Sequence, residues 1–215
     1  MSQKSVLFYD KTKGYKSMKY ITDNVINRIN GYGRGSVFYS GDFKDLGTTK
    51  TVNRILERLS QKGKLKRLSP GIYYFQKKSQ LLGVLSPRID KIAAAVARKN
   101  NMKILISESL AANLLSLTTQ VPAKNIFLTD GKTKTFKVDN QTIYFKHSSP
   151  KAMGLSKRKS GVVAQALKFF GKDRIDSNII ATLKQNLPDP TKADLPKCKP
   201  FVPDWACSVI YKIIE

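Results

Sequence analysis

Basic, amide and hydroxyl side chains recur between Asp45 and Gly63, in DLGTTKTVNRILERLSQKG, where a helix would bring them together. At about 100° per residue, Lys50, Arg54 and Gln61 lie opposite the apolar stripe of that helix. The neighbouring lines hold Asn53 and Glu57 on one side, and Thr51 and Arg58 on the other. Arginine can donate two hydrogen bonds to guanine, and asparagine can pair with adenine. This spacing indicates a helix face able to contact the bases of nucleic acid.

The start of the helix and the segment after it carry groups suited to phosphate oxygens. Threonines and a lysine open the helix, where the helix dipole favours anions. Thr48 or Thr49 is also expected to cap the helix through its hydroxyl. Basic residues in the following hairpin are placed to contact the DNA backbone beside the groove. The candidate DNA-binding residues are therefore Thr48, Thr49, Lys50, Thr51, Asn53, Arg54, Arg58, Gln61, Lys64, Lys66 and Arg67.

A polar helix face is usually only solvated, and this alternative applies to Lys50, Arg54 and Arg58 as well. Glu57 fits DNA contact least, because a carboxylate repels phosphate. Three roles remain open for it: an ion pair with Arg54, a contact with Asn53, or a hydrogen bond from a cytosine amino group.

The elements around this helix follow the order of a winged helix-turn-helix over residues 17–78. A helix is expected from about Met18, a short helix around Gly41–Leu46, and a hairpin around Pro70-Gly71 after Gly63 ends the central helix. In this motif the later helix enters the major groove. Residues 1–16 are expected to form a flexible basic tail. The aromatic pair Tyr73-Tyr74 could stack on bases, but on a wing strand one of the two rings is expected to pack inward.

The charge balance favours a polyanionic partner. The 215 residues contain 39 Lys and Arg against 15 Asp and Glu, a net charge of +24. Residues 1–78 hold 17 of those basic and five of the acidic residues, so charge is densest at the N-terminal end. Such a field attracts DNA, RNA or an anionic membrane. No apolar run is long enough for a membrane span or a signal-peptide core, and Cys198 and Cys207 are expected to be thiols. We expect a cytoplasmic protein that binds no membrane.

The remaining chain predicts a larger mixed α/β domain over residues 79–187, giving an α+β protein with a small antiparallel sheet. The predicted elements are a helix from Ser86, a strand at Lys103–Ser107, a helix at Glu108–Leu117, strands at Asn125–Thr129, Thr133–Val138 and Gln141–Phe145, and helices at Gly161–Phe170 and Ser177–Asn186. Residues 188–215 comprise a proline-rich, extended connection from Pro188 to Pro203 and an amphipathic helix from about Trp205. That helix either closes the protein's own core or docks on a partner or a second copy.

The chain shows no convincing catalytic or metal-binding set. His147 is the one histidine, which excludes a His-rich metal site, and no Asp is placed by motif to orient it. The glycines of NGYGRG follow a helix rather than a strand, so they do not form a dinucleotide-binding loop. The basic stretch Ser148–Gly161 is expected to be a solvated, flexible loop, with a second nucleic-acid contact as the alternative. We expect no enzyme activity, cofactor or metal.

An ordered series of motifs from about residue 18 to 186 resembles the AbiEi-like antitoxin family of bacterial type IV toxin–antitoxin systems. The segments that carry the resemblance are RINGYGRGSVFYSGDFKDLGTTKTVNRILERLSQKGKLKRLSPGIYYF, GVLSP, AANLLSLTTQVPAKNIFLTDG, IYFKHSSP and GVVAQALKFFGKD. The resemblance implies a winged helix that binds and represses the promoter of its own operon. It also implies a C-terminal domain that counteracts a nucleotidyltransferase-type toxin without a stable complex.

The sequence thus favours a sequence-specific DNA-binding antitoxin and autorepressor, acting on double-stranded DNA as a monomer or homodimer. A stand-alone winged-helix regulator and an RNA-binding protein of the same fold are the alternatives. Comparison of duplex DNA with structured RNA separates them, since RNA binding led by shape shows little sequence preference.

Overall fold

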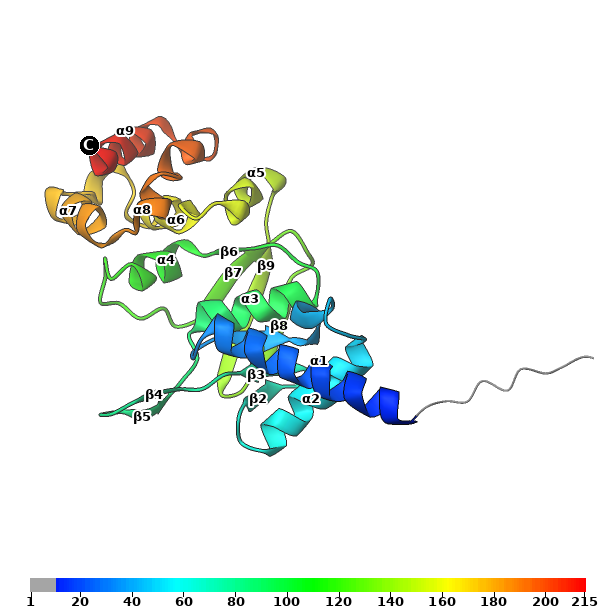
Figure 1. The fold of residues 1–215 in the computed structure, drawn as a ribbon. Coiled ribbons are helices and arrows are strands. Elements are labelled where there is room, and N and C mark those ends of the chain that lie inside the picture. The colour runs from blue at the N-terminus through cyan, green and yellow to red at the C-terminus, as the bar shows by residue number, and fades with distance from the viewer. Residues whose placement is uncertain (1–10) are drawn as a thin grey trace, which may run out of the picture. The chain divides into compact units, whose positions relative to one another are not determined.

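The computed structural model describes residues 11–215, which form two compact units (Figure 1). Unit 1 ends at Arg88 and unit 2 begins at Ile89. Each combines helices with a small sheet, so the predicted α+β class is confirmed. The predicted boundary after residue 78 is too early, because a hairpin that the sequence patterns did not predict continues unit 1.

Unit 1 opens with helix α1 (Lys11–Tyr32). Residues 1–10 of the predicted flexible tail lie outside the described residues, but residues 11–16 form the first turns of α1. The start predicted at Met18 is therefore late. The segment before Met18 lacks the apolar repeat by which a helix is predicted, yet it contains no proline to prevent one.

The rest of unit 1 comprises a three-stranded sheet, one short 3₁₀ helix, one capped α-helix and a separate two-stranded hairpin. Its elements are β1 (Val37–Tyr39), the 3₁₀ helix η1 (Ser40–Phe43), α2 (Thr49–Gln61), β2 (Lys66–Ser69), β3 (Ile72–Tyr74), β4 (Lys77–Ser79) and β5 (Gly83–Leu85). The first sheet is antiparallel in the order β1-β3-β2, and β4 pairs with β5 in a separate hairpin. The turn between β2 and β3 contains Gly71 at φ +74°, which confirms the predicted hairpin.

The core of unit 1 is formed where α1 and α2 pack against the sheet and η1. It comprises Val25, Ile29, Phe38, Phe43, Val52, Ile55, Leu56, Leu59, Leu65 and Tyr73. The rings of Phe38 and Phe43 meet edge to face, with centroids 5.5 Å apart. This arrangement is favourable for aromatic pairs and fixes η1 under β1.

Tyr73 and Tyr74 are both buried, with exposed fractions of 3% and 1%. Successive residues of a strand point to opposite sides of a sheet, and β3 is the central strand with both of its sides covered. Tyr73 joins the α1–α2 core, and burial raises the pKa of its hydroxyl. Neither ring is placed to stack on bases.

Unit 2 begins with helix α3 (Ile89–Lys99), which packs on a four-stranded sheet. The strands are β6 (Ile104–Ile106), β7 (Asn125–Thr129), β8 (Lys134–Val138) and β9 (Gln141–His147), in the order β6-β7-β9-β8. The three runs predicted between residues 125 and 145 are all strands. β7 and β9 pair in parallel, whereas the two outer pairings are antiparallel.

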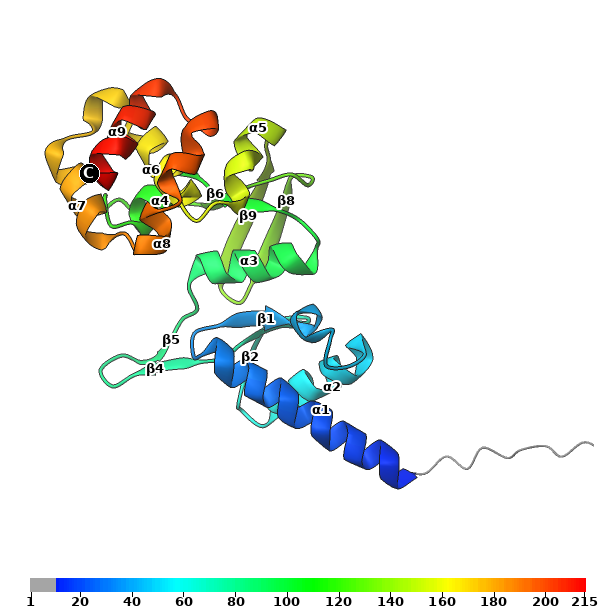
Figure 2. The same cartoon turned by 45° about the horizontal axis from the view of Figure 1, so that its top comes forward.

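The other helices of unit 2 form a second layer beside this sheet (Figure 2). They are α4 (Glu108–Leu114), α5 (Pro150–Met153), η2 (Gly154–Lys157), α6 (Gly161–Phe170), η3 (Lys172–Arg174), α7 (Ser177–Asn186), α8 (Asp189–Lys192), η4 (Leu195–Phe201) and α9 (Asp204–Ile214). The predicted bounds of α6 and α7 are confirmed. Gln165 of α6 donates a hydrogen bond from Nε2 to the carbonyl of Ile106 at 2.9 Å, which ties this layer to the end of β6.

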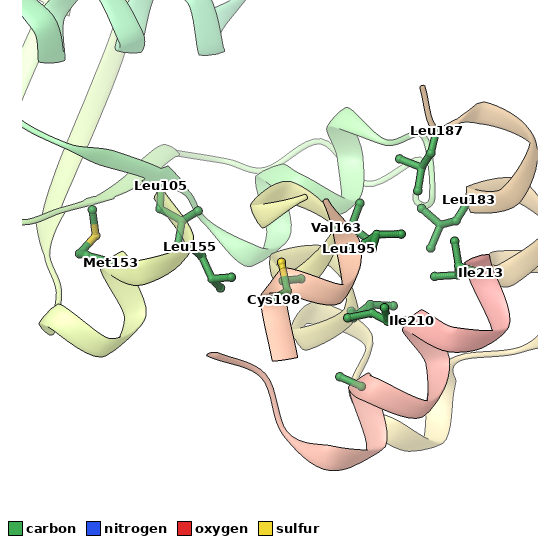
Figure 3. Packing of buried hydrophobic residues seen from close by; sticks show 13 residues of the cluster. Leu105, Met153, Leu155, Val163, Leu183, Leu187, Leu195, Cys198, Ile210 and Ile213 are labelled. Carbon is green, nitrogen blue, oxygen red and sulfur yellow. The ribbon is translucent and has the colours of Figure 1, made fainter. Parts of the chain in front are cut away.

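The proline-rich segment before α9 is not the predicted extended connection, because it contains α8 and η4. Proline is compatible with the first turn of a helix, and both short helices begin in this way. In Figure 3, Leu195 and Cys198 of η4 lie in the same cluster as Ile210 and Ile213 of α9. The alternative in which α9 closes the protein's own core is therefore the one observed.

A buried polar contact joins the start of α6 to η4. The Ser160 hydroxyl donates to an Asp194 carboxylate oxygen at 2.8 Å and lies 2.9 Å from Cys198 Sγ. Burial alone would raise the pKa of Asp194, but the hydrogen bonds from Ser160 and the nearby cations Lys197 and Arg158 lower it below the ordinary value. Both cysteines are buried free thiols, as expected.

Candidate nucleic-acid interface

Helix α2 is fixed at both of its ends by local hydrogen bonds. Thr48 is the N-cap, and its Oγ1 accepts a hydrogen bond from the Thr51 amide at 3.2 Å. At the other end, the amides of Gly63 and Lys64 donate to the carbonyls of Ser60 and Leu59, a Schellman motif with Gly63 at φ +69°. The predicted cap and stop are both confirmed, and they set where the polar face begins and ends.

The polar face of α2 is exposed along its whole length. Val52, Ile55, Leu56 and Leu59 are buried beneath it, as the sequence pattern predicted. Four side chains on this face form no hydrogen bond or ion pair with any residue between 18 and 215: Lys50, Asn53, Arg54 and Gln61. Their donors and acceptors are available to a ligand.

The three threonines at the start of α2 differ in whether their hydroxyl groups are already hydrogen-bonded within the helix. Thr48 is committed to the cap, and its Oγ1 also lies 2.9 Å from the hydroxyl of Thr51. Thr49 is exposed at the first helical position. Thr48 and Thr51 therefore stabilise the helix start, whereas Thr49 is available for contact beside Lys50.

Arg58 lies on the α1 side of the helix. Its Nη2 donates a hydrogen bond to Thr22 Oγ1 of α1 at 3.1 Å. The helical projection placed Arg58 near the exposed face but could not show where α1 lies. In the folded protein this guanidinium joins two helices, so Arg54 is the arginine of α2 left for an external ligand.

The β2–β3 hairpin places three further cations next to α2. Lys64, Lys66 and Arg67 are all exposed. Nη1 of Arg67 lies 3.8 Å from the Glu57 carboxylate of α2. None of the three roles considered for Glu57 involved this arginine, because the contact depends on how the strand returns beside the helix.

An ion pair positions α2 relative to α1. Arg28 of α1 donates two hydrogen bonds to the carboxylate of Asp45, at 2.5 and 2.7 Å, in the turn that leads to Thr48. The Arg28 hydrogen bond lowers the pKa of Asp45 below its usual range. In the same connection, Asp42 accepts a hydrogen bond from the Tyr39 amide at 3.1 Å. These carboxylates are thus used in building the fold.

The charge around this surface is one-sided. From Arg58 to Ile89 the sequence contains eight basic residues and no Asp or Glu. This stretch includes the end of α2, the β2–β3 hairpin and the β4–β5 hairpin. Lys77 and Lys78 of β4 belong to it and were not among the candidate residues. The signal for this hairpin in the sequence is Gly83, the first residue of β5, which is at φ +66°.

His147 and two side chains of the basic stretch Ser148–Gly161 have structural roles. His147 Nδ1 lies 2.9 Å from the Gly131 carbonyl, so this nitrogen carries the proton and donates it. The stretch Ser148–Gly161 is not the flexible loop that was expected, because it forms α5 and η2. Met153 and Leu155 from this stretch are buried in the core, which explains its order.

Neither metal-binding nor membrane-spanning features occur in the part of the chain that the structure describes. Between residues 11 and 215, His, Cys, Asp and Glu side chains form no group of three that could hold a metal ion. Over the same residues, each helix is too short or too polar to cross a bilayer.

Comparison with known proteins places the chain in a family. No curated protein matches it. Residues 24–195 match the model of a family of unknown function, DUF6088. The match covers most of unit 1, including all of α2 and the β2–β3 hairpin, and continues through unit 2 as far as η4. Because it spans most of the sequence, the protein belongs to the DUF6088 family.

Proposed function

We propose that unit 1 is a winged helix-turn-helix domain that binds duplex DNA, with α2 in the major groove and the β2–β3 hairpin as the wing. The observation that carries this proposal is the row of unengaged side chains on α2, in particular Lys50, Asn53 and Arg54. Arginine and asparagine match the base edges exposed in the major groove. Lysines on the wing suit the phosphates beside it.

The arrangement of the elements supports the same proposal. Unit 1 runs α1, β1, η1, α2, β2, β3, and its sheet has the order β1-β3-β2. The short η1 segment and the turn held by Asp45 precede α2, and a hairpin follows it. The order is that of a helix-turn-helix extended by a wing.

The biological role that we propose is that of an antitoxin and transcriptional autorepressor in the cytoplasm. It rests on the motif resemblance to AbiEi-like antitoxins. The DNA would be the promoter region of its own operon, bound by a monomer or homodimer. Unit 2 would counteract a nucleotidyltransferase-type toxin without forming a stable complex with it, and neither unit would act as an enzyme.

A gel-shift titration tests the DNA-binding proposal. The full-length protein is titrated against the duplex upstream of its own gene, a shuffled duplex of the same composition, and a structured RNA of equal length, all at matched salt. We expect the upstream duplex to bind at least about 10³-fold more tightly than the shuffled duplex. Equal affinity for all three would contradict sequence-specific binding, and preference for the RNA would favour the RNA-binding alternative.

A further inference from the structure

The β4–β5 hairpin, residues 77–85, projects from the rest of unit 1 in both views (Figures 1 and 2). Its tip carries two adjacent leucines. Leu81 is 94% exposed and Leu82 is 77% exposed. Among the residues that the structure describes, Leu81 is the most exposed large apolar side chain. These side chains are not part of the core of unit 1, and adjacent exposed apolar side chains are a feature of interaction sites.

The hairpin is held in place at its base by one buried side chain. The hydroxyl of Tyr74 donates a hydrogen bond to the Leu85 carbonyl at 2.9 Å and accepts one from the Lys77 amide at 3.3 Å. Tyr74 belongs to β3, the central strand of the wing sheet. The same hydroxyl thus fastens both strands of the hairpin to the wing.

The tip has its own hydrogen bonds. Ser79 Oγ accepts from the amides of Leu81 and Leu82 at 3.3 and 3.4 Å. Gly83, the next residue, is at φ +66°, a conformation that suits glycine in a three-residue hairpin loop. These contacts hold the two leucines side by side on a turn, rather than at the end of an unstructured loop.

The surface around the tip is basic. Lys77 and Lys78 are exposed on β4, and Gln80 is exposed at the turn. The absence of Asp and Glu from residues 58–89 applies to the whole hairpin. A basic stem that ends in bulky aliphatic side chains matches the proteins that enter the minor groove of DNA, where lysine and glutamine contact the groove and leucine is wedged between base steps.

A second copy of the chain fits the tip less well. A stable dimer needs about 800 Å² of buried surface on each partner, and two leucines supply only a fraction of this area. The net charge of +24 also opposes contact between two copies. Complementary charge therefore favours a polyanion as the occupant.

We propose that the β4–β5 hairpin is an arm that inserts Leu81 and Leu82 into the minor groove and bends the duplex bound by α2. This inference rests on the proposed DNA-binding function. From Lys77 to Leu81 the arm extends by about 13 Å, at roughly 3.3 Å per residue. Successive grooves of DNA are about 17 Å apart, half of the helical turn. The arm covers most of that separation, and it starts from the β2–β3 wing, which lies beside α2.

The test uses short duplexes recovered from a random-sequence library by the full-length protein. Each duplex carries a fluorescence donor at one end and an acceptor at the other, so that bending increases energy transfer. Unstacked thymines are detected separately by permanganate. The compared proteins are the wild type, Leu81→Ala/Leu82→Ala, Leu81→Met/Leu82→Met, and Val121→Ala, which shortens an exposed apolar side chain in unit 2.

The wild type, the methionine variant and Val121→Ala are expected to bend the duplex and expose a thymine. The alanine variant is expected to lose both signals, while its affinity falls by no more than about tenfold because α2 and the wing still bind. Bending and thymine reactivity that survive in the alanine variant would overturn the arm proposal alone. Self-association and binding to anionic vesicles are measured for the same proteins. An alanine variant that loses either of these but keeps the bending and thymine signals would also overturn the arm proposal. Failure of the wild type to recover any duplex would overturn the proposed function as well.

Discussion

The carboxylate of Glu57 lies 3.8 Å from the guanidinium of Arg67, so α2 and strand β2 are joined by an ion pair. Both side chains are about half exposed, and such surface pairs contribute at most about 1 kcal/mol to stability. The pair has a larger effect on the local charge, because the Glu57 carboxylate partly neutralises Arg67. In the proposed function, Arg67 contacts the phosphate backbone of DNA.

Replacing Glu57 by glutamine is expected to strengthen DNA binding. The change removes the carboxylate that competes with phosphate for Arg67, so the slope of log K against log salt should steepen by about one. The measurement is a fluorescence-anisotropy titration at several salt concentrations. Asp23→Asn is the matched control, since Asp23 is an exposed carboxylate on α1 and its removal changes the net charge equally. If both variants steepen the slope to the same extent, the Glu57–Arg67 contact has no specific effect.

Arg58 and Arg54 are expected to differ in what they stabilise. Arg58→Ala removes the hydrogen bond to Thr22, so the free energy of unfolding should fall by about 0.5–1 kcal/mol. Arg54→Ala should leave it unchanged, because Arg54 has no partner among residues 18–215. Denaturant unfolding measures both. If the two residues stabilise the protein through this hydrogen bond, the double variant Arg58→Ala/Thr22→Val should lose less free energy of unfolding than the sum of the two single variants. Losses that add fully would show that the two residues act independently.

Local features of unit 1 could be predicted from the sequence because a few residues determine them. Thr48 and Gly63 mark the ends of α2 by their own chemistry, and the apolar repeat between them determines its buried side. The partners of Glu57 and Arg58 could not be predicted in this way. They depend on where β2 and α1 lie around the helix, and a projection of one helix contains no information about its neighbours.

The C-terminal region shows the same limit. The prolines between residues 188 and 203 indicated an extended connection, yet proline is equally compatible with the first turn of a short helix. What decides between them is burial of Leu195 and Cys198 in the core of unit 2, a tertiary contact. The parallel pairing of β7 with β9 is likewise set by the path of the chain, because alternation alone does not distinguish parallel from antiparallel strands.

The stability of unit 2 is expected to depend on pH through Asp194. Because the folded-state pKa of Asp194 is lowered from 3.8, its ionised form stabilises the fold above that value, and this contribution is lost as the pH falls through the lowered pKa. Urea unfolding followed from neutral pH into the acid range measures the effect. Asp194→Asn should be less stable at neutral pH and should lose less stability on acidification. A variant with the same acid profile as the wild type would contradict this assignment.

Gly161 is expected to tolerate no larger side chain. A Cβ atom there would lie 2.5 Å from the backbone oxygen of Leu155, which cannot move as the end of a flexible side chain can. Gly161→Ala should therefore destabilise the protein by about 1–3 kcal/mol. Gly31→Ala is the matched control, because nothing lies within 4 Å of its Cβ position and alanine favours the α1 helix. Denaturation midpoints that respond alike to both changes would contradict the close packing at Gly161.

The most direct test of the proposed function is base discrimination by Arg54. The wild type, Arg54→Ala and Lys50→Ala are titrated at several salt concentrations. The DNA is the duplex that the wild type binds most tightly, together with the full set of its single base-pair variants. Arg54→Ala should lose about 1–3 kcal/mol of discrimination at one base position, whereas loss of a phosphate contact at Lys50 should lower the salt slope by about one for every duplex. If both variants bind every duplex as the wild type does, α2 is not the element that contacts DNA.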